Sequence, residues 1–557
     1  MSNLQINTRV RRLFQYLEDF ERGKIQVPPF QRDFVWNNQK KLDLMDSLKN
    51  GFPIGSVLFW QPESVNSFDM VDEELQSVGT YQLRSKNNDF YFILDGYQRL
   101  STLFGCFIDP HTTNLHRIES DWKKEFDIVY NLKDDNFEFN RRSRSDLEIY
   151  RIPLYHFVTS ERFYDFQTDL TGANISEEDK REYIIRYKNF GSKISSYDIP
   201  SIDLVGGTIK EAVDIFSRLN SKGERITEDW KVSALSFSRE RNFRFGSKID
   251  ELFERIERYN FFTSASDRKS KRELILQCVV SAFGKLYFDV SSASRELEQL
   301  ALQSNFIDVC LQAMDSIVIA VQFLYEELLV LDSRLLPYNS QLIFITQFFN
   351  QQPHPHRTQI EKLKRWFWIT TYSNYFTIYN LGRQRTAYEY FKGFINDELV
   401  NPVFYDKYDH FETIEFPKKI AMNSVRAKAL ALFMINHAVR NNNIMHSSLL
   451  MDRDHMHYDL YRIFNHMEIE EDTNISENTI ILVRERSVYR ETANRFNFFE
   501  LFHTLDMGHT ENLFVTAEMV FQYNRTNNQV EFLRERLNLI KSSEKLFVES
   551  LNMQYEE

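Results

Sequence analysis

A short buried strand that turns directly into a helix is the feature that most constrains the fold of this chain. Residues 91–94 form an apolar run typical of a buried strand, and Asp95-Gly96 then makes a pair suited to a tight turn. From Gln98 onward the apolar residues recur at helical spacing. The first backbone N–H groups of a helix have no partner within it and attract anions, most often phosphate. The pattern therefore predicts an anion site where the strand ends.

Two charged residues at this turn indicate what the site would bind. Arg99 carries a fixed fork of N–H donors that matches phosphate, and Asp95 suits a metal ion or a ribose hydroxyl. The alternative is that Asp95 and Arg99 simply pair with each other and serve only the fold.

The composition is that of a multidomain cytoplasmic protein. At 557 residues, of which 42% are hydrophobic and 49 are Phe, the chain is long enough for two to four domains with large cores. No apolar run reaches the length of a membrane span, and the polar N-terminus carries no signal-peptide pattern, so we expect neither membrane insertion nor export. The three cysteines are far apart in sequence, which fits a reducing compartment and argues against a zinc site built from thiolates.

The charge balance limits how the protein would contact nucleic acid. The formal net charge is −12 and the pI is near 5.7, whereas a protein that coats nucleic acid is basic overall. Contact with DNA would therefore need a local basic groove. Basic residues cluster at 268–272 and at 357–365, the latter next to Trp366 and Trp368. Such a stretch either lines a DNA groove or forms a solvated helix face.

Residues 25–36 form a second unusual segment. Its two prolines favour an extended backbone, and Arg32 is flanked by aromatic residues. An arginine held between rings loses little entropy when it binds a planar or anionic ligand. In the alternative interpretation the segment packs its rings into the core and leaves Arg32 in solvent.

Hydrophobic periodicity predicts mixed strands and helices in the first part of the chain and helices from residue 248 to 438. In the first part we expect helices at 8–22, 39–49 and 176–189, and strands at 53–60, 126–130, 137–140, 150–158 and 199–205.

Short polar and apolar blocks follow one another in an order that resembles a known domain. They are Pro-x-Phe-Gln-Arg-x-Phe-Val-Trp at 28–36, Gly-x-Pro-Ile-Gly at 51–55, Asp-Gly-x-Gln-Arg-Leu-x-Thr-Leu at 95–103 and Ile-Phe-x-x-Leu-Asn-x-x-Gly at 215–223. In this order they resemble the N-terminal domain of the GmrSD-type modification-dependent restriction proteins. That domain is similar in fold to ParB and sulfiredoxin.

The resemblance implies that this region binds and hydrolyses a nucleoside triphosphate, with Asp95 and Arg99 taking part in hydrolysis. Tyr97 departs from the family motif, in which Gln is usual, and Asn220 also fits a simple role at the end of a helix. The implied nucleotide-binding residues are Gln31, Arg32, Asp95, Gly96, Gln98, Arg99 and Asn220.

Histidines concentrate in the C-terminal part, where ten of the 13 follow residue 350. Asp454-His455, then a polar stretch, then Asn478 at the start of an expected helix resembles a His-Me finger (HNH) nuclease. GmrSD-type proteins carry such a domain after their nucleotide domain. Phosphodiester hydrolysis needs a base for the attacking water and a cation on the phosphate, which these residue types supply.

The resemblance assigns a role to each of these residues. His455 would be the base, Asp454 a ligand of Mg²⁺ or Mn²⁺, and Asn478 the residue that orients His455. The place of the second metal ligand falls on Ser487, and Ser is a weak ligand for Mg²⁺. Three nearby residues are alternatives among which the sequence does not choose: His457, Glu485 and Asn494.

We therefore expect an α+β protein in three parts. A ParB/sulfiredoxin-like α+β domain would occupy residues 1–240 and a mostly helical middle domain residues 241–440. A helical C-terminal region at 441–557 would contain a ββα His-Me finger-like element.

The hypothesis for function is a cytoplasmic defence nuclease in which nucleotide turnover gates DNA cleavage. Its partners would be DNA, with modified phage DNA as one option, and either a second copy or a separate subunit. The competing hypothesis is a nucleotide-responsive DNA-binding sensor whose finger is inactive, a view that Ser487 favours. A scaffold without either activity explains the ordered polar motifs least well.

Overall fold

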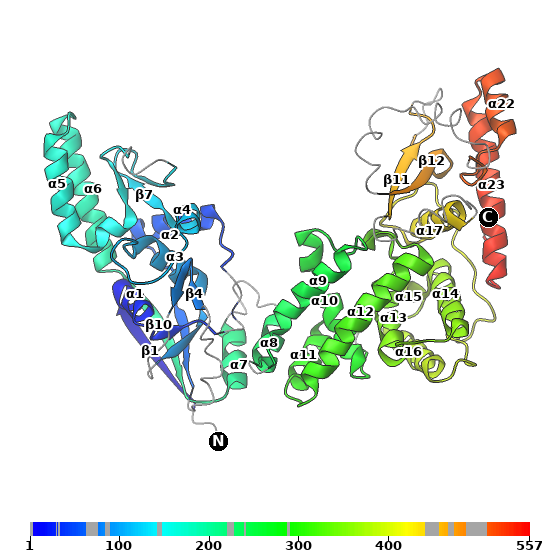
Figure 1. Ribbon diagram of the computed structural model, residues 1–557, viewed down its shortest axis with the longest axis horizontal. Coiled ribbons are helices and arrows are strands. Elements are labelled where there is room, and N and C mark those ends of the chain that lie inside the picture. Colours follow the sequence, from blue (N-terminus) through cyan, green and yellow to red (C-terminus); the bar gives the residue numbers. More distant parts are fainter. Residues whose placement is uncertain are drawn as a thin grey trace. The chain divides into compact units, whose positions relative to one another are not determined.

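The computed structural model divides the chain into two compact units, Met1–Gly246 and Ser247–Glu557. The first unit combines sheets with helices and the second is mainly helical (Figure 1). This mixture fits the expected α+β class. The structure describes residues 4–28, 31, 34–62, 76–83, 90–141, 147–219, 228–238, 241–286, 290–440, 456–465, 473–485 and 510–556.

A mixed five-stranded sheet organises the first unit. β1 runs antiparallel to β10, β10 parallel to β3, β3 antiparallel to β6, and β6 parallel to β2. The strand predicted at 91–94 is β6, and it has a partner on each side. In spatial order the strands are β1 (Gln5–Arg12), β10 (Asp198–Val205), β3 (Val57–Gln61), β6 (Tyr91–Asp95) and β2 (Ile25–Gln26).

Each face of this sheet carries its own hydrophobic core. On one face Phe59 and Ile93 pack with buried residues of α1, α2 and α3. On the other face Leu58 and Leu94 pack with residues of α7 and α8. Successive strand side chains point to opposite faces, so one apolar run serves both cores. The helices are α1 (Leu13–Glu21), α2 (Asn38–Asn50), α3 (Tyr97–Phe107), α7 (Ile209–Leu219) and α8 (Glu228–Ser236).

A smaller three-stranded sheet in the order β8–β7–β9 extends the core that contains Phe59 and Ile93, together with a pair of helices, α5 and α6. The remaining elements of this unit are β4 (Gln76–Val78), β5 (Tyr81–Leu83), α4 (Glu119–Phe126), β7 (Ile128–Asn131), β8 (Asn136–Phe139), β9 (Arg151–Pro153), η3 (Leu154–Val158), α5 (Ser160–Gly172) and α6 (Glu177–Ser195).

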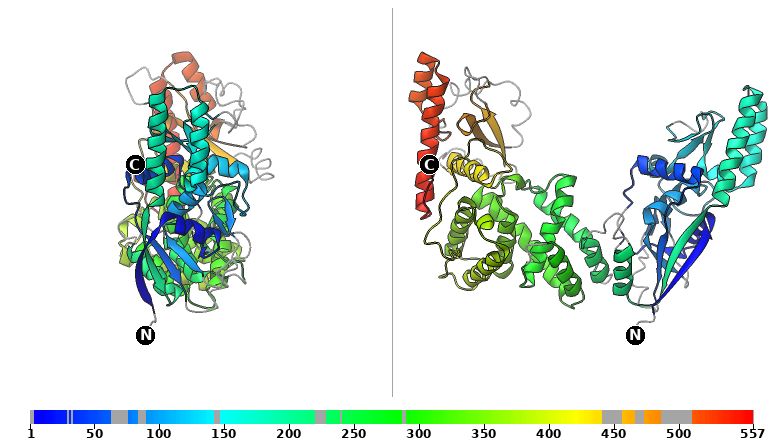
Figure 2. Two further views of the ribbon diagram at one scale, coloured as in Figure 1. Left: turned by 90° about the vertical axis from the view of Figure 1, so that its left-hand side faces the viewer. Right: turned by 180° about the vertical axis from the view of Figure 1, so that it is seen from behind.

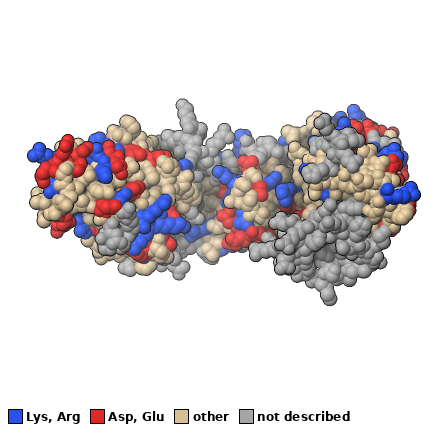
Figure 3. Space-filling model, turned by 90° about the horizontal axis from the view of Figure 1, so that it is seen from above, with Lys and Arg blue, Asp and Glu red and all other residues tan. Residues whose placement is uncertain are grey.

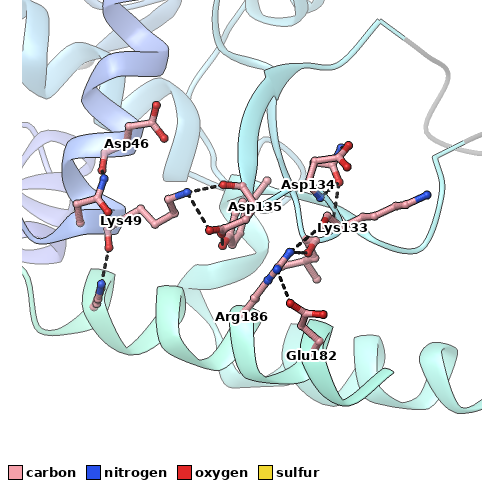
Figure 4. Close-up of polar contacts among 12 residues, drawn as sticks. Asp46, Lys49, Lys133, Asp134, Asp135, Glu182 and Arg186 are labelled. Carbon is pink, nitrogen blue, oxygen red and sulfur yellow. Dashed lines mark hydrogen bonds and ion pairs between the residues drawn. The ribbon is translucent and has the colours of Figure 1, made fainter. Parts of the chain in front are cut away.

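Polar contacts hold the turn between β7 and β8 against two helices (Figure 4). Lys49, near the end of α2, bonds the backbone carbonyl of Asp135 and pairs with its carboxylate. Arg186 of α6 donates to the carbonyl oxygens of Leu132 and Lys133, at 2.6 and 2.8 Å. Asp135 has a φ of 55°, a left-handed conformation that few non-glycine residues adopt. The contacts from α2 and α6 hold the turn in this conformation.

The helix predicted at 8–22 is wrong in its first part. Residues 5–12 are strand β1, which pairs with β10 along its whole length, and the helix begins at Leu13. The open edge of β10 offers backbone partners to a polar, arginine-rich segment that has no apolar stripe at helical spacing. Sheet pairing therefore overrides local propensity.

The strand predicted at 150–158 is also shorter than expected. Only Arg151–Pro153 is extended, and Leu154–Val158 forms a 3-10 helix. Leu154, Tyr155 and Phe157 are all buried, which a tight helical turn against the core allows. The predicted segment is largely apolar but contains Arg151, Pro153 and His156, and a short segment of this kind does not distinguish strand from helix.

The second unit opens with the helices predicted from residue 248 to 438. They are α9 (Phe245–Glu257), α10 (Ala265–Ala282), α11 (Val290–Leu300), α12 (Phe306–Leu328), α13 (Asn339–Gln351), α14 (Arg357–Tyr372), α15 (Tyr375–Ile378), α16 (Leu381–Asn396) and α17 (Val425–Arg440).

Among the helices that the structure describes, α12 alone has the length and apolar character to cross a membrane, which the sequence analysis did not foresee. However, 56% of its most apolar window is buried inside the protein. The helix packs against α10 and α13. A core helix passes the same test of length and hydropathy, so α12 is weak evidence for a membrane span.

The described residues of the C-terminal part of this unit form a two-stranded antiparallel sheet and two helices (Figure 2, right). Ile480 and Leu482 of β12 pack with Phe532 and Leu533 of α23 in a separate core. The elements are β11 (Met456–Arg462), η7 (Ser476–Asn478), β12 (Thr479–Glu485), α22 (Ala517–Thr526) and α23 (Gln529–Ser550).

A buried ion pair joins α17 to α23. Arg426 donates to both carboxylate oxygens of Glu544, at 2.8 and 2.7 Å, and the two side chains are 4% and 0% exposed. Tyr372 and Tyr555 also donate to Glu544, at 3.0 and 2.9 Å. Burial disfavours the Arg426 cation, but the Glu544 carboxylate outweighs this effect and raises the pKa of Arg426. The charge is therefore stable only while its partner is present.

Removing the Glu544 carboxylate should destabilise the second unit strongly. Glu544→Ala leaves the Arg426 cation buried without a counter-charge, which costs about 3–5 kcal/mol. Urea unfolding of the full chain, followed by tryptophan fluorescence, measures the loss. Glu549 lies at an exposed position of the same helix, and Glu549→Ala should change the free energy of unfolding by less than about 0.5 kcal/mol. Equal effects of the two variants would contradict the role of the pair.

Candidate functional site

The predicted turn after β6 is present and depends on Gly96. This residue precedes the first turn of α3 with a φ of 90°, which side chains with a Cβ atom rarely adopt. A Cβ atom placed there would lie 2.1 Å from Cγ1 of Val57. Both the backbone angle and the neighbouring strand therefore require glycine at this position.

Arg99 lies in the first turn of α3 and connects it to the segment before β3. Its Nη1 donates to the carbonyl oxygen of Ile54 at 2.5 Å, and its Nη2 donates to that of Ser56 at 2.8 Å. Nη2 also donates to the carboxylate of Asp95 at 3.1 Å. The Arg99 side chain is 20% exposed and that of Asp95 35%. The alternative in which Asp95 and Arg99 pair thus describes this conformation, with Asp95 the more accessible of the two.

Gly55 is a part of the site that sequence reasoning missed. It lies between the two carbonyl groups that accept from Arg99, with a φ of 88°, and a Cβ atom there would lie 2.5 Å from Nη1 of Arg99. The block Gly-x-Pro-Ile-Gly contributed to the resemblance, but nothing in it predicted contact with Arg99. The signal available in the sequence was the pair Gly51 and Gly55 on either side of a proline, and the structure gives both a positive φ.

Two glutamines of the predicted site bond to backbone groups. The side-chain amide of Gln31 donates to two successive carbonyl oxygens at the end of β6, at 3.2 and 3.1 Å. The side-chain oxygen of Gln98 accepts from the N–H groups of Val35 and Trp36, at 2.9 and 3.3 Å. These bonds fix the segment at residues 31 and 34–36 beside β6 and the first turn of α3.

The junction of β6 and α3 thus brings together most of the predicted nucleotide-binding residues: Gln31, Asp95, Gly96, Gln98 and Arg99. Arg32 and Asn220 lie outside the described residues, and their roles stay predictions. The helix expected before Asn220 is present as α7, which ends at Leu219.

The described parts of the chain contain no group of three or more His, Cys, Asp or Glu side chains that would hold a metal ion. The predicted ligands Asp454 and Ser487 and the predicted base His455 lie outside those parts, as does Asn494. The backbone register of β11 and β12 sets Met456 opposite Glu485 and His457 opposite Arg484.

The helix predicted to begin at Asn478 is wrong, because residues 479–485 form β12, antiparallel to β11. The segment runs Ile480-Ile481-Leu482-Val483, which is apolar on both faces and rich in β-branched residues. Such a run favours a strand once a neighbouring strand supplies backbone partners.

Asn478 is completely buried and bonds to the backbone. Its side-chain oxygen accepts from the N–H of Phe464 at 2.9 Å, and its amide donates to the carbonyls of Phe464 and Thr473, at 2.9 and 2.8 Å. Arg536 of α23, also completely buried, donates to the carbonyls of Glu477 and Thr479 on either side. Burial lowers the pKa of Arg536 to about 9. These contacts fix the start of β12, and the orienting role predicted for Asn478 stays untested.

The two basic clusters bond within the second unit. Arg268 pairs with Glu257 at 2.8 Å, and Arg365 donates to backbone carbonyls near the end of the chain. Trp366 and Trp368 are 0% and 5% exposed, so bases have no ring face there on which to stack. On the face shown in Figure 3, Lys and Arg side chains are interspersed with Asp and Glu. These contacts support the solvated helix face over the DNA groove.

Residues 13–237 match the family model described as the GmrSD restriction endonuclease, N-terminal domain. This range contains the whole junction of β6 and α3, and within it the chain is similar to the N-terminal domain of GmrSD-like restriction proteins. The chain is also 22% identical over 404 residues to an uncharacterized protein of Methanocaldococcus jannaschii. That similarity covers 66% of this chain and 65% of the relative.

Gly96→Ala should weaken the sheet at β6. The substitution places a side chain at positive φ and against Val57, which costs about 1–3 kcal/mol. Hydrogen–deuterium exchange of the full chain, read by mass spectrometry, should show faster exchange of the β6 amides. Gly172→Ala is the control, because a Cβ atom there would meet nothing within 4 Å. If the β6 amides exchanged as slowly in Gly96→Ala as in the native chain, the turn would not require glycine.

Proposed function

We propose that this chain is a nucleotide-dependent DNA endonuclease of the restriction type that acts in defence against phage or foreign DNA. The N-terminal unit binds and hydrolyses a nucleoside triphosphate, and the C-terminal region cuts DNA with a divalent metal ion. The observation that carries the proposal is the assembly of Asp95, Gln98 and Arg99 at the start of α3, inside the range that matches the GmrSD N-terminal domain.

In this proposal Asp95 faces the nucleotide, and Arg99 positions the Asp95 carboxylate. Arg99 already donates to two backbone carbonyls, which hold its guanidinium in place beside the more exposed Asp95 carboxylate. A Mg²⁺ ion bound to nucleotide phosphates needs only one or two protein carboxylates, and Asp95 supplies one. The positive end of the α3 backbone adds attraction for the phosphate groups.

The cleavage part of the proposal draws on the C-terminal hairpin and on the sequence. A ββα finger needs two antiparallel strands, and β11 and β12 supply such a pair. His455 is the residue before β11 and Ser487 the second after β12, and the antiparallel register puts those two strand ends at the same end of the hairpin. Asp454 would hold the metal ion, and His455 would take a proton from the attacking water.

Regulation of DNA cleavage by the nucleotide requires coupling between the nucleotide site and the cleavage site. Nucleotide turnover gates cleavage only if two states of the chain bind the nucleotide differently.

The second candidate function is a nucleotide-responsive DNA-binding sensor with an inactive finger. Ser487, a weak metal ligand in the place of the second one, is the observation that favours it.

Arg99→Ala should weaken binding of ATP or GTP, each with Mg²⁺, by at least about tenfold, because Asp95 loses the partner that orients it. Isothermal titration calorimetry of the full chain measures the affinity. Arg186→Ala is a matched control, because Arg186 also donates to two backbone carbonyls and pairs with a carboxylate, that of Glu182, but at the β7–β8 turn. The control should bind as the native chain does. Unchanged binding by Arg99→Ala would contradict the site.

His455→Ala should reduce plasmid cleavage in Mg²⁺ or Mn²⁺ by about 10²–10⁴-fold, the usual contribution of a general base. Cleavage is assayed on plain and modified DNA, with and without nucleoside triphosphate. His354, an exposed histidine of the same unit, serves as control through His354→Ala, which should cut normally.

Ser487→Asn then separates the two candidate functions. A gain in metal-dependent nicking would show that the native finger is impaired. If the native chain cuts neither kind of DNA under any of these conditions, the sensor takes the place of the nuclease.

A further inference from the structure

Strand β1 lies at the outer edge of the five-stranded sheet, and among the described residues no strand pairs with its second side (Figure 1). It pairs with β10 over all eight of its residues without a register shift, and six of them are exposed. An open edge presents backbone N–H and C=O groups that can pair with another strand. Proteins usually protect such an edge with charged side chains or by covering it.

The arginines on β1 protect this edge against a second strand less than its sequence implies. Asp203 pairs with both Arg9 and Arg11, at 3.3 and 3.7 Å. Arg12 pairs with Asp198 at 3.2 Å. The three arginines of the strand therefore have counter-charges in their own chain, so they oppose the approach of a second strand only weakly.

The face of β1 opposite Arg9 and Arg11 carries apolar side chains, with Arg12 at its end. Ile6 and Val10 are 59% and 63% exposed, and Thr8 lies between them. Residues at spacing two point to one face of a sheet, so these three side chains form a row. Arg11 belongs to the other set, because its guanidinium lies 4.5 Å from the ring centre of Tyr16.

We propose that β1 pairs with β1 of a second copy of this chain, antiparallel across a two-fold axis at Thr8. In this register Ile6 lies opposite the partner's Val10, and Val10 opposite the partner's Ile6. Asn7 lies opposite the partner's Arg9, so no two like charges face each other. The pairing joins two five-stranded sheets into one and covers the edge of both, and it does not depend on the proposed function.

Neighbouring registers fit less well. A two-fold axis at Arg9 sets the two Arg9 side chains opposite each other, which is unfavourable. An axis at Asn7 sets Ile6 opposite the partner's Thr8 and loses both Ile–Val pairs. Among pairs formed within residues 5–12, only the axis at Thr8 matches apolar with apolar on one face and polar with charged on the other. Closed two-fold symmetry is also the commonest arrangement for identical chains.

Cysteine pairing tests the register directly. Ile6→Cys and Val10→Cys are purified separately, mixed and oxidised, and non-reducing electrophoresis measures the linked dimer. Opposed residues have Cα atoms about 4.5–5.5 Å apart, within disulfide reach. Like positions are four residues apart along the strand, about 13 Å at the rise of a strand, and cannot link. The mixture should therefore link far more than either variant alone, while the native cysteines are buried and stay silent.

A measurement of mass without any cysteine complements this test. Size-exclusion chromatography with light scattering should find a dimer for the native chain and a monomer for Val10→Lys, which sets a charge against the partner's Ile6. A native chain that is monomeric up to its solubility limit overturns the proposal. So does a dimer that survives Val10→Lys, or linking of the single cysteine variants as strong as that of the mixture.

Discussion

Much of the predicted site depends on the hydrogen bonds that the Arg99 guanidinium donates. The guanidinium of this residue bonds the backbone before β3 and the carboxylate at the end of β6 while it sits in the first turn of α3. The planar guanidinium holds its N–H donors in a fixed fork that reaches three separate acceptors, whereas the donors of a lysine all lie on one nitrogen atom. Gly55 and Gly96 provide the close approach that these bonds require. The blocks of sequence that contain Gly55 and Gly96, about 40 residues apart, therefore meet at the Arg99 side chain.

The second unit depends on buried charges that are satisfied in two different ways. Arg426 has a carboxylate partner, Glu544, which in turn accepts from two tyrosines. Arg536 donates to the carbonyl oxygens of Glu477 and Thr479 at the start of β12 and to that of Leu513, and its pKa is lowered to about 9 by burial. The Arg426–Glu544 pair joins α23 to α17, and Arg536 joins α23 to the start of β12. The hairpin proposed to carry the cleavage site is therefore fixed to the C-terminal helix by backbone contacts, which a search for catalytic motifs does not detect.

Sequence patterns predicted elements well where the pattern and the packing agreed. The strand at 91–94, the turn at Gly96 and the helix after it are all present, because an apolar run, a glycine and a helical stripe each have one favourable structure there. Predictions failed where a neighbouring strand decided the outcome. Residues 5–12 and 479–485 are strands because β10 and β11 pair with them, and periodicity within a segment contains no information about such partners.

The sequence by itself determined the chemistry of the candidate site: which acid, which arginine, and the strand-to-helix turn that carries them. Tertiary structure alone decided what each group does there. It gave Arg99 two carbonyl partners, used Gln31 and Gln98 to hold the backbone, and left Asp95 the more accessible charge. The physical reason is that a side chain's role follows from the donors and acceptors around it, and here those belong to segments brought together only by folding.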